Sequence, residues 1–289
     1  MTSPGATPLT GVPVTALGVA MIRDRESGRD DRLYDDPYAH AFAEAARDAF
    51  LDPKAPAEAA KQWAQIEQLV DQFYEGRTVG VRAVDDRVQA WVDEGGKQLV
   101  MVGAGLDTRA YRMGLPADLR WFELDLPEMF EFKEPVLTSV DATPTCDRRV
   151  VPVDLRTDWA PRLVAAGYET DVPTAWIDEG VIPYLSQDEA TRVAATITRL
   201  SAPGSEFGTV RAKVDETQQR YRELKRLVAT DAEHPAVVRG LGPHAQGWLE
   251  QNGWRTEFRS WDETAKPYSR PLAITGDPSN GAIHAVRRG

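Results

Sequence analysis

The sequence is poor in cysteine. Cys146 stands alone among 289 residues, which excludes an internal disulfide framework and a paired-cysteine metal or redox site. A single thiol becomes a nucleophile only beside an activating base, and the alternative is a small residue in a loop. We favour the loop, and we expect a protein of the reducing cytoplasm.

Positive charge and long apolar runs are also scarce. The chain has 34 lysine and arginine residues against 45 acidic residues, which gives a net charge of −11. Such a field repels nucleic acid and anionic membranes. Residues 1–14 lack the basic and apolar parts of a secretory signal, and no later segment has the apolar length that spans a bilayer. Neither nucleic acid nor membrane is therefore an expected partner.

The chain divides into a tail, a helical segment and an alternating segment. Residues 1–13 are small, polar and rich in proline, which predicts a disordered tail. Apolar residues recur at helical spacing over 14–96, and we expect an N-terminal helical cap there. Short β-rich and helical runs alternate over 97–289, which predicts one α/β core. A charged stretch at about 214–250 is expected as a helical insertion after the fifth strand.

The alternating segment predicts a mostly parallel seven-stranded sheet whose last two strands form an antiparallel edge. Expected strands cover 98–103, 119–126, 148–155, 173–180, 205–212, 254–261 and 281–288. Expected helices cover 58–73 and 79–92 in the cap, then a run after Asp107, 128–137, 159–166 and 186–200, the last with a Ser186–Glu189 capping box.

A glycine turn follows the first expected strand. Gly103 and Gly105 allow the backbone to approach a ligand closely, although an ordinary tight turn is the alternative. A dinucleotide-binding turn needs a third small residue where this chain has Thr108, and Asp107 adds negative charge there. These residues disfavour a phosphate-bearing ligand and thus a nicotinamide-dependent oxidoreductase. The turn suits a nucleoside with a cationic centre and an amino group, such as S-adenosylmethionine.

Two aspartates end the second and third expected strands. Asp125, 22 residues after Gly103, is placed to accept both hydroxyls of a ribose. Its alternative role is a turn or helix-capping aspartate before Pro127. Asp154 and the Leu155 backbone are placed to recognise an adenine amino group, and the alternative for Asp154 is a helix cap.

An acid and an arginine complete the predicted site. Glu179 ends the fourth strand and faces the methionine portion of the cofactor or the acceptor, whereas Asp178 points to the opposite face by strand alternation. Arg82 is a candidate partner for the cofactor carboxylate, and its alternative is an exposed helical arginine.

The four histidines offer no obvious general base, because none stands at the end of one of the first four strands. They are His40, His234, His244 and His284. Their spacing predicts no metal site, although His244 at a helix start could serve a hydroxyl acceptor. A carboxylate acceptor, which is already ionised at neutral pH, is therefore favoured.

Several motifs together carry a family resemblance over about 14–204. They are "TALGVAMIRDRES", "DRLYDDPYA", "VRAVDDR", "VGAGLDTRAYR", "FELDLPE", "VPVDLR" and "WIDEGVIPYLS". The set resembles bacterial S-adenosylmethionine-dependent methyltransferases of the leucine carboxyl methyltransferase superfamily. The resemblance implies a Rossmann-like class I methyltransferase fold with an N-terminal helical cap.

The resemblance also implies roles for individual residues. Cofactor contacts are implied for Arg82, Gly103, Asp125, Asp154, Leu155 and Glu179, and Tyr184 is implied to lie near the acceptor. Eukaryotic relatives hold the cofactor carboxylate with an N-terminal lysine, for which Arg32 is the candidate replacement here. The expected activity is O-methylation of a carboxylate on a small molecule or peptide. Methylation of a hydroxyl, or cofactor binding without turnover, are the alternatives.

Overall fold

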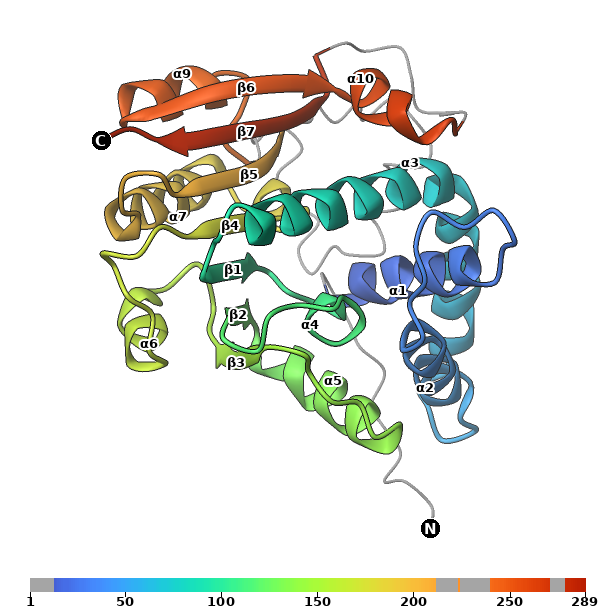
Figure 1. Ribbon diagram of the computed structural model, residues 1–289. Coiled ribbons are helices and arrows are strands. Elements are labelled where there is room, and N and C mark those ends of the chain that lie inside the picture. The colour runs from blue at the N-terminus through green and yellow to red at the C-terminus, as the bar shows by residue number, and fades with distance from the viewer. Residues whose placement is uncertain (1–12, 212–222, 224–239, 271–278) are drawn as a thin grey trace.

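The computed structural model describes residues 13–211, 223, 240–270 and 279–289. Three helices form the N-terminal cap, and a mixed α/β core follows (Figure 1). The cap helices are α1 Pro13–Ser27, α2 Ala39–Leu51 and α3 Ala59–Asp93. The predicted tail up to residue 12 and most of the predicted insertion at about 214–250 lie outside the described residues.

The core is built on a seven-stranded sheet of order β3-β2-β1-β4-β5-β7-β6. The first five strands in this order are parallel, and β7 is antiparallel to both β5 and β6. All seven strands were expected, as was the antiparallel edge. The strands are β1 Gln98–Val102, β2 Arg120–Asp125, β3 Asp147–Pro152, β4 Ala175–Asp178, β5 Glu206–Arg211, β6 Trp254–Ser260 and β7 Gly281–Arg287.

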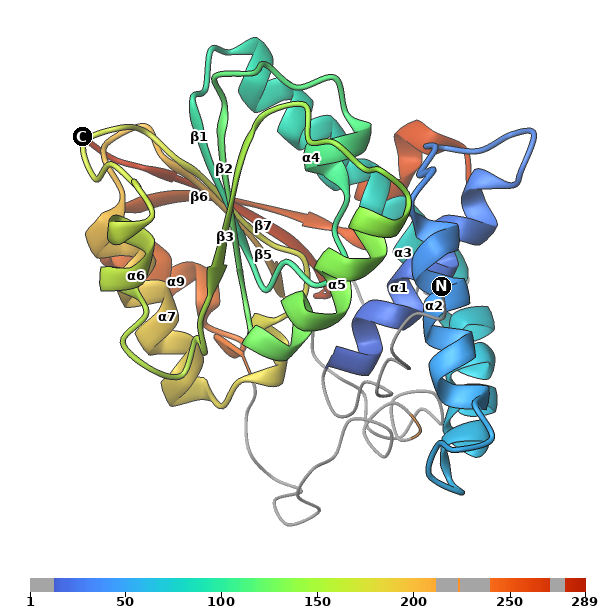
Figure 2. The same ribbon diagram turned by 90° about the horizontal axis from the view of Figure 1, so that it is seen from below.

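Helices cover both faces of the sheet, as Figure 2 shows. One face packs Leu99, Met101 and Trp121 against the cap and α5, and the other packs Val100 and Phe122 against α6, α7 and α9. Burial on both faces explains why β1 is apolar from Leu99 to Val102. The core helices are α4 Arg109–Arg112, α5 Pro127–Ser139, α6 Ala160–Ala165, η1 Ile182–Tyr184, α7 Gln187–Leu200, α9 Ala245–Gln251, α10 Trp261–Ala265 and η2 Lys266–Tyr268.

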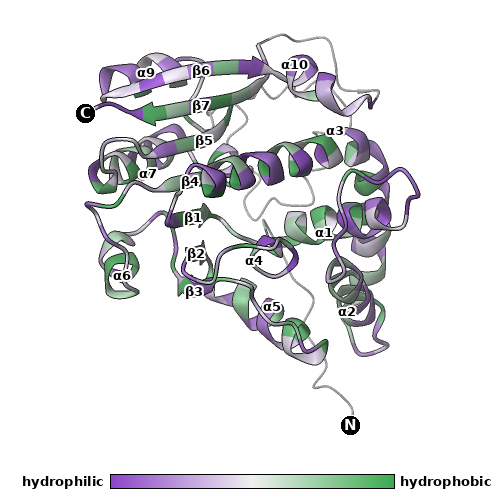
Figure 3. Ribbon diagram, in the orientation of Figure 1, coloured by the Kyte–Doolittle hydropathy of each residue, from purple (hydrophilic) through white to green (hydrophobic). Residues whose placement is uncertain are grey.

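The cap contains one long helix where two were expected. α3 continues through the region between the predicted helices 58–73 and 79–92, because its buried stripe continues through Tyr74, Thr78 and Val79. That packing outweighs the roughly 1 kcal/mol cost of Gly76 inside a helix. α3 alternates between hydrophobic and hydrophilic residues along its length (Figure 3). None of the described helices, α3 included, combines the length and apolarity needed to cross a membrane.

The helix expected after Asp107 is a single turn, since the backbone is already extended at Met113. The capping box at the start of α7 is confirmed, with the Ser186 hydroxyl accepting from the Glu189 backbone and the Glu189 carboxylate accepting from the Ser186 backbone. α7 therefore begins where the sequence indicated.

The turn after β1 depends on its glycines. Gly103 has φ +71° and Gly105 has φ +49°. A Cβ atom on Gly103 would lie 2.5 Å from Cβ of Val181, and one on Gly105 would lie 3.1 Å from Cβ of Ala16. Val181 follows β4 and Ala16 belongs to α1, so this turn is where the cap and the β4 loop meet the end of β1.

Gly103→Ala should lower the free energy of unfolding more than Gly95→Ala. Both positions have positive φ, at +71° and +87°, but nothing lies within 4 Å of a Cβ atom on Gly95. Backbone strain should cost about 1–2 kcal/mol at each position, and the clash with Val181 should add at least about 1 kcal/mol for Gly103→Ala. Urea unfolding measures both; equal losses would show that the β4 loop gives way freely.

Candidate functional site

The carboxyl ends of β1 and β2 are joined by one carboxylate. Oδ2 of Asp125 accepts the backbone N–H of Gly105 at 2.6 Å, and Oδ1 accepts that of Leu126 at 2.7 Å. Burial raises the pKa of Asp125 above its usual range, although these two hydrogen bonds favour the ionised form. The aspartate therefore fixes the glycine turn and is placed beside it, as a ribose ligand would require.

Glu179 follows β4 and is held by Arg109. Its Oε2 accepts Nη1 of Arg109 at 2.6 Å, whereas its Oε1 is buried without a hydrogen-bond partner in the described part of the chain. Arg109 is itself buried in the turn that begins α4. The structure thus connects Glu179 to the helical turn that follows Gly105, through an arginine that was not predicted.

A cluster of buried charges lies between the cap and this turn. Arg109 also pairs with Asp107 and, at 2.6 Å, with Asp85 of α3. Arg112 donates two hydrogen bonds to Asp85, at 2.6 and 2.8 Å. A buried charge is costly unless it is paired with an opposite charge. These ion pairs therefore hold the cap against the turn.

A second part of the cluster ties α1 to the glycine turn. Arg23 donates to the Leu106 carbonyl at 2.6 Å and pairs with Asp36 at 3.2 Å. The Thr108 hydroxyl donates to Asp36 at 2.7 Å. The cap residue that reaches the turn is therefore Arg23, whereas Arg32 is exposed and donates to the Arg29 carbonyl.

Asp178 and Glu179 have separate surroundings. Oδ1 of Asp178 accepts the backbone N–H groups of Gly180, Val181 and Ile182, and Oδ2 accepts the Thr209 hydroxyl at 2.7 Å. Burial raises the pKa of Asp178 despite these bonds. Asp178 is thus a structural residue that shapes the β4 loop, whereas Glu179 has one oxygen without a partner among the described residues.

Asp154 has a local partner. Its carboxylate accepts the Arg156 backbone N–H at 2.9 Å and the Arg156 guanidinium at 2.7 Å, which holds the pKa of Asp154 below its usual range. Leu155 is buried in the core, and Tyr184 is half-buried at the end of η1. The predicted roles of these three residues toward adenine and acceptor stay predictions.

Two arginines of α3 differ in what they face. Nη1 of Arg82 donates to the Leu33 carbonyl at 2.6 Å and Nε donates to Asp86 at 2.8 Å. Nη1 of Arg77 donates to the Glu179 carbonyl at 2.9 Å. Arg77 therefore reaches the end of β4, whereas Arg82 contacts the loop that follows α1.

Two sequence arguments change in the light of the structure. The charge of Asp107 was expected to repel phosphate, but its carboxylate is buried against Arg109, and the positive charges around it keep its pKa below the usual range despite burial. The charge of Asp107 is therefore no reason to exclude a phosphate-bearing ligand. Cys146 is buried, and burial raises its pKa to about 12, so its thiol stays protonated.

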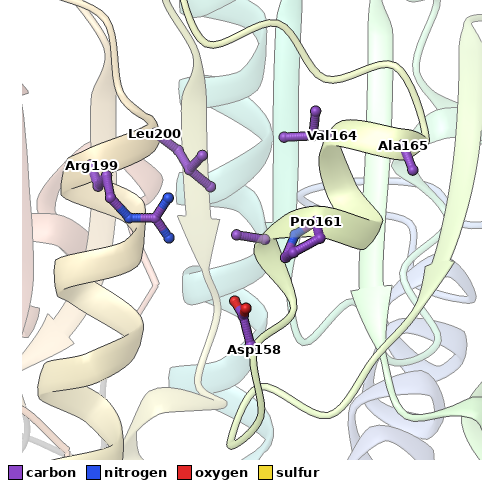
Figure 4. Close-up of a pocket in the computed structure, with 7 residues that line it drawn as sticks. Asp158, Pro161, Val164, Ala165, Arg199 and Leu200 are labelled. Atoms are coloured by element: carbon purple, nitrogen blue, oxygen red, sulfur yellow. The ribbon is translucent and has the colours of Figure 1, made fainter.

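None of the described histidines forms a hydrogen bond or ion pair with Gly103, Asp125 or Glu179. His40 lies between Asp24 and Glu44 on the cap, His284 pairs with Glu206 at 3.1 Å, and His244 is exposed at the start of α9. His234 lies outside the described residues. A separate open hollow of about 450 Å³ lies between α6 and the end of α7 (Figure 4). Its lining, which includes Asp158 and Arg199, contains no predicted site residue.

Sequence patterns did not predict the buried cluster. Four of its residues lie in the motifs that carry the family resemblance: Arg23, Asp36, Asp85 and Arg109. Arginines and aspartates on predicted helices are typical of a solvated surface, so their burial was not expected. The sequence feature that could have indicated the cluster is "DTRAYR", directly after the glycine turn. Its two arginines follow the end of one strand, and other expected strands end in acids.

Known proteins resemble this chain along most of its length. The family model described as leucine carboxyl methyltransferase matches residues 16–198. A protein of Frankia alni, assigned by name to the S-adenosyl-L-methionine-dependent methyltransferases, is 40% identical and covers 96% of this chain and 95% of its own. One of Streptomyces coelicolor, assigned in the same way, is 36% identical over 96% of both chains.

A solved structure supports the fold independently. A Thermobifida fusca protein, assigned by name to the methyltransferases, has a TM-score of 0.53 at 18% identity and covers 84% of this chain and 93% of its own. At this identity the likeness concerns the fold alone, and it agrees with a Rossmann-like sheet. The family match and the full-length relatives lead to one conclusion: the chain belongs to the leucine carboxyl methyltransferase family.

Proposed function

We propose that the protein transfers a methyl group from S-adenosylmethionine to a carboxylate oxygen of a small molecule or peptide. Family membership carries the coarser statement, that it is an S-adenosylmethionine-dependent methyltransferase. The carboxylate proposal rests on the absence of a described histidine beside Gly103, Asp125 and Glu179. A carboxylate, with a pKa of about 4, is already ionised at neutral pH, whereas a hydroxyl needs a base.

The chain's own part in such a reaction is positioning. The cofactor supplies a methyl group that its sulfonium already activates. The protein then has to align the acceptor oxygen in line with that methyl group and keep water out, an effect worth up to about 7–11 kcal/mol. Val181 and Ala16 lie close around the glycine turn and supply apolar walls for this purpose.

The cofactor is proposed to lie along the carboxyl ends of β1, β2 and β4. The backbone of Gly103 and Gly105 lies against it, and Asp125, which is bonded to Gly105, accepts the ribose hydroxyls. Asp154 and the Leu155 backbone recognise the adenine amino group, and Glu179 accepts from the ammonium group of the methionine part. Tyr184 lies on the acceptor side and positions the acceptor.

The carboxylate of the methionine part has two candidate partners on α3. The sequence favoured Arg82, which is a candidate still, but its guanidinium faces Leu33 and Asp86. Arg77 reaches the backbone at Glu179, beside the predicted ammonium site. Because ammonium and carboxylate are attached to the same carbon atom in this ligand, the geometry favours Arg77.

Asp125→Asn should weaken binding of S-adenosylhomocysteine by about 10- to 100-fold, because a hydrogen bond to a charged group contributes about 1.5–3 kcal/mol. In the wild type, affinity should fall as the pH drops through the pKa of Asp125, which burial raises, so the loss should begin above the usual aspartate range. Calorimetric titration between pH 4.5 and 8 measures both effects. Asp147→Asn is the control, because Asp147 lies at the start of β3, away from the carboxyl ends of the strands. Equal pH dependence in the wild type and Asp125→Asn would contradict the role of Asp125.

Arg77→Gln should weaken S-adenosylhomocysteine by at least tenfold and leave its decarboxylated analogue, which carries an aminopropyl group, within threefold. Arg82→Gln should change neither ligand by more than threefold. Isothermal titration of both ligands against both variants separates the two arginines. The opposite pattern would return the carboxylate contact to Arg82.

The acceptor class is tested with tritiated S-adenosylmethionine and matched probes: benzoate against phenol, octanoate against octanol, and a peptide with a free C-terminal leucine against its amide. Label should appear only with the carboxylates, and alkali should release it as methanol, because esters hydrolyse in base. His244→Gln should leave the rate unchanged. Base-stable label on phenol or octanol, lost in His244→Gln, would establish hydroxyl methylation, and binding without transfer to any of these probes would favour a protein without turnover.

A further inference from the structure

Arg109 is the most heavily shared side chain of the buried cluster. Its side chain is 1% exposed, and its nitrogens reach four oxygens on three separate segments. Nε donates to Asp85 at 2.6 Å, Nη1 donates to Asp107 and, at 2.6 Å, to Glu179, and Nη2 donates to the Val81 carbonyl at 3.1 Å. Every nitrogen of the guanidinium is therefore committed, and each faces a fixed direction.

The contact with Glu179 decides where that carboxylate points. Arg109 occupies Oε2, while Oε1 is buried and has no partner within the described ranges. A buried acceptor without a partner costs about 1–3 kcal/mol, more when it carries charge. The geometry thus leaves one carboxylate oxygen ready for a donor that the described part of the chain does not supply.

Arg109 also connects this oxygen to the cap. Asp85 and Val81 belong to α3, one turn apart, and both bind Arg109. Arg112 donates to both oxygens of the same Asp85. If α3 shifts, Arg109 loses two of its four partners, and its hold on Glu179 loosens with them.

Lysine could not replace this arginine. The guanidinium is planar and presents its donors as a rigid fork, which lets one side chain serve Asp85, Glu179 and a carbonyl at once. An ammonium group has one nitrogen, so it would hold one or two of these oxygens and leave the others buried and unpaired. The fork, beyond the positive charge, is what the site requires.

We propose that Arg109 is a positioning residue: by holding Oε2 of Glu179 it directs Oε1 toward the ammonium group of the cofactor's amino-acid part, and by holding Asp85 it makes that direction depend on the docked cap. The inference rests on the proposed placement of the cofactor. Arg109 touches the carboxylate and not the ligand, so its effect is confined to ligands that carry the ammonium group.

Three adenosine ligands separate positioning from a general loss of structure. S-adenosylhomocysteine carries ammonium and carboxylate, its aminopropyl analogue carries ammonium alone, and 5′-methylthioadenosine carries neither. Arg109→Lys should weaken the first two by at least tenfold and leave the third within threefold. Arg148→Lys is the matched control, because the Arg148 side chain is only 5% exposed but pairs with Glu123 and Glu134 on the α5 side of the sheet. This variant should leave the ratios among the three ligands unchanged.

A second variant tests the connection to the cap and serves if Arg109→Lys does not fold. Asp85→Asn should weaken the two ammonium ligands by at least threefold and spare 5′-methylthioadenosine, whereas Asp93→Asn, at the end of the same helix, should change none. Uniform weakening of all three ligands by Arg109→Lys and Asp85→Asn, or no weakening, would overturn the inference alone. Failure of the wild type to bind S-adenosylhomocysteine would overturn the inference and the proposed function together.

Discussion

The need to pair buried charges is the constraint on which this structure depends. Arg23, Arg109 and Arg112 lie out of water with Asp36 and Asp85, and removing one partner of such a pair typically costs about 3–5 kcal/mol. The partners come from α1, the loop before α2, α3 and the turn after β1. The packing of the cap and that of the turn after β1 therefore depend on each other.

The acids at the strand ends differ in how their oxygens are engaged. Both oxygens of Asp178 accept hydrogen bonds, from three backbone N–H groups and Thr209, whereas one oxygen of the adjacent Glu179 has no partner among the described residues. Asp125 accepts the backbone N–H of Gly105 and stays partly exposed. Strand alternation separates Asp178 from Glu179, and the hydrogen bonds show which oxygens of each acid are engaged.

The sequence predicted what local pattern controls. The seven strands followed from apolar runs, the start of α7 from Ser186 and Glu189, and the place of Asp125 from strand order. Contacts between residues distant in the chain were not predicted. Arg109 contacts Asp85 across 24 residues and Glu179 across 70, and Arg23 contacts Thr108 across 85. No periodicity encodes such a meeting. The single long α3 was missed because tertiary burial outweighed the local effect of Gly76.

Arg109 is bound by residues of both the cap and the core, which limits how parts of related proteins can be exchanged. A core beginning at residue 97 would retain Arg109, Asp107 and Glu179 but would lose Asp85 and the Val81 carbonyl, both of which lie on α3. The cap and the core therefore cannot be exchanged independently of each other. A chimaera that grafts a relative's cap to alter acceptor choice would have to retain the α3 surface that grips Arg109, and could vary freely only the helix faces turned away from it.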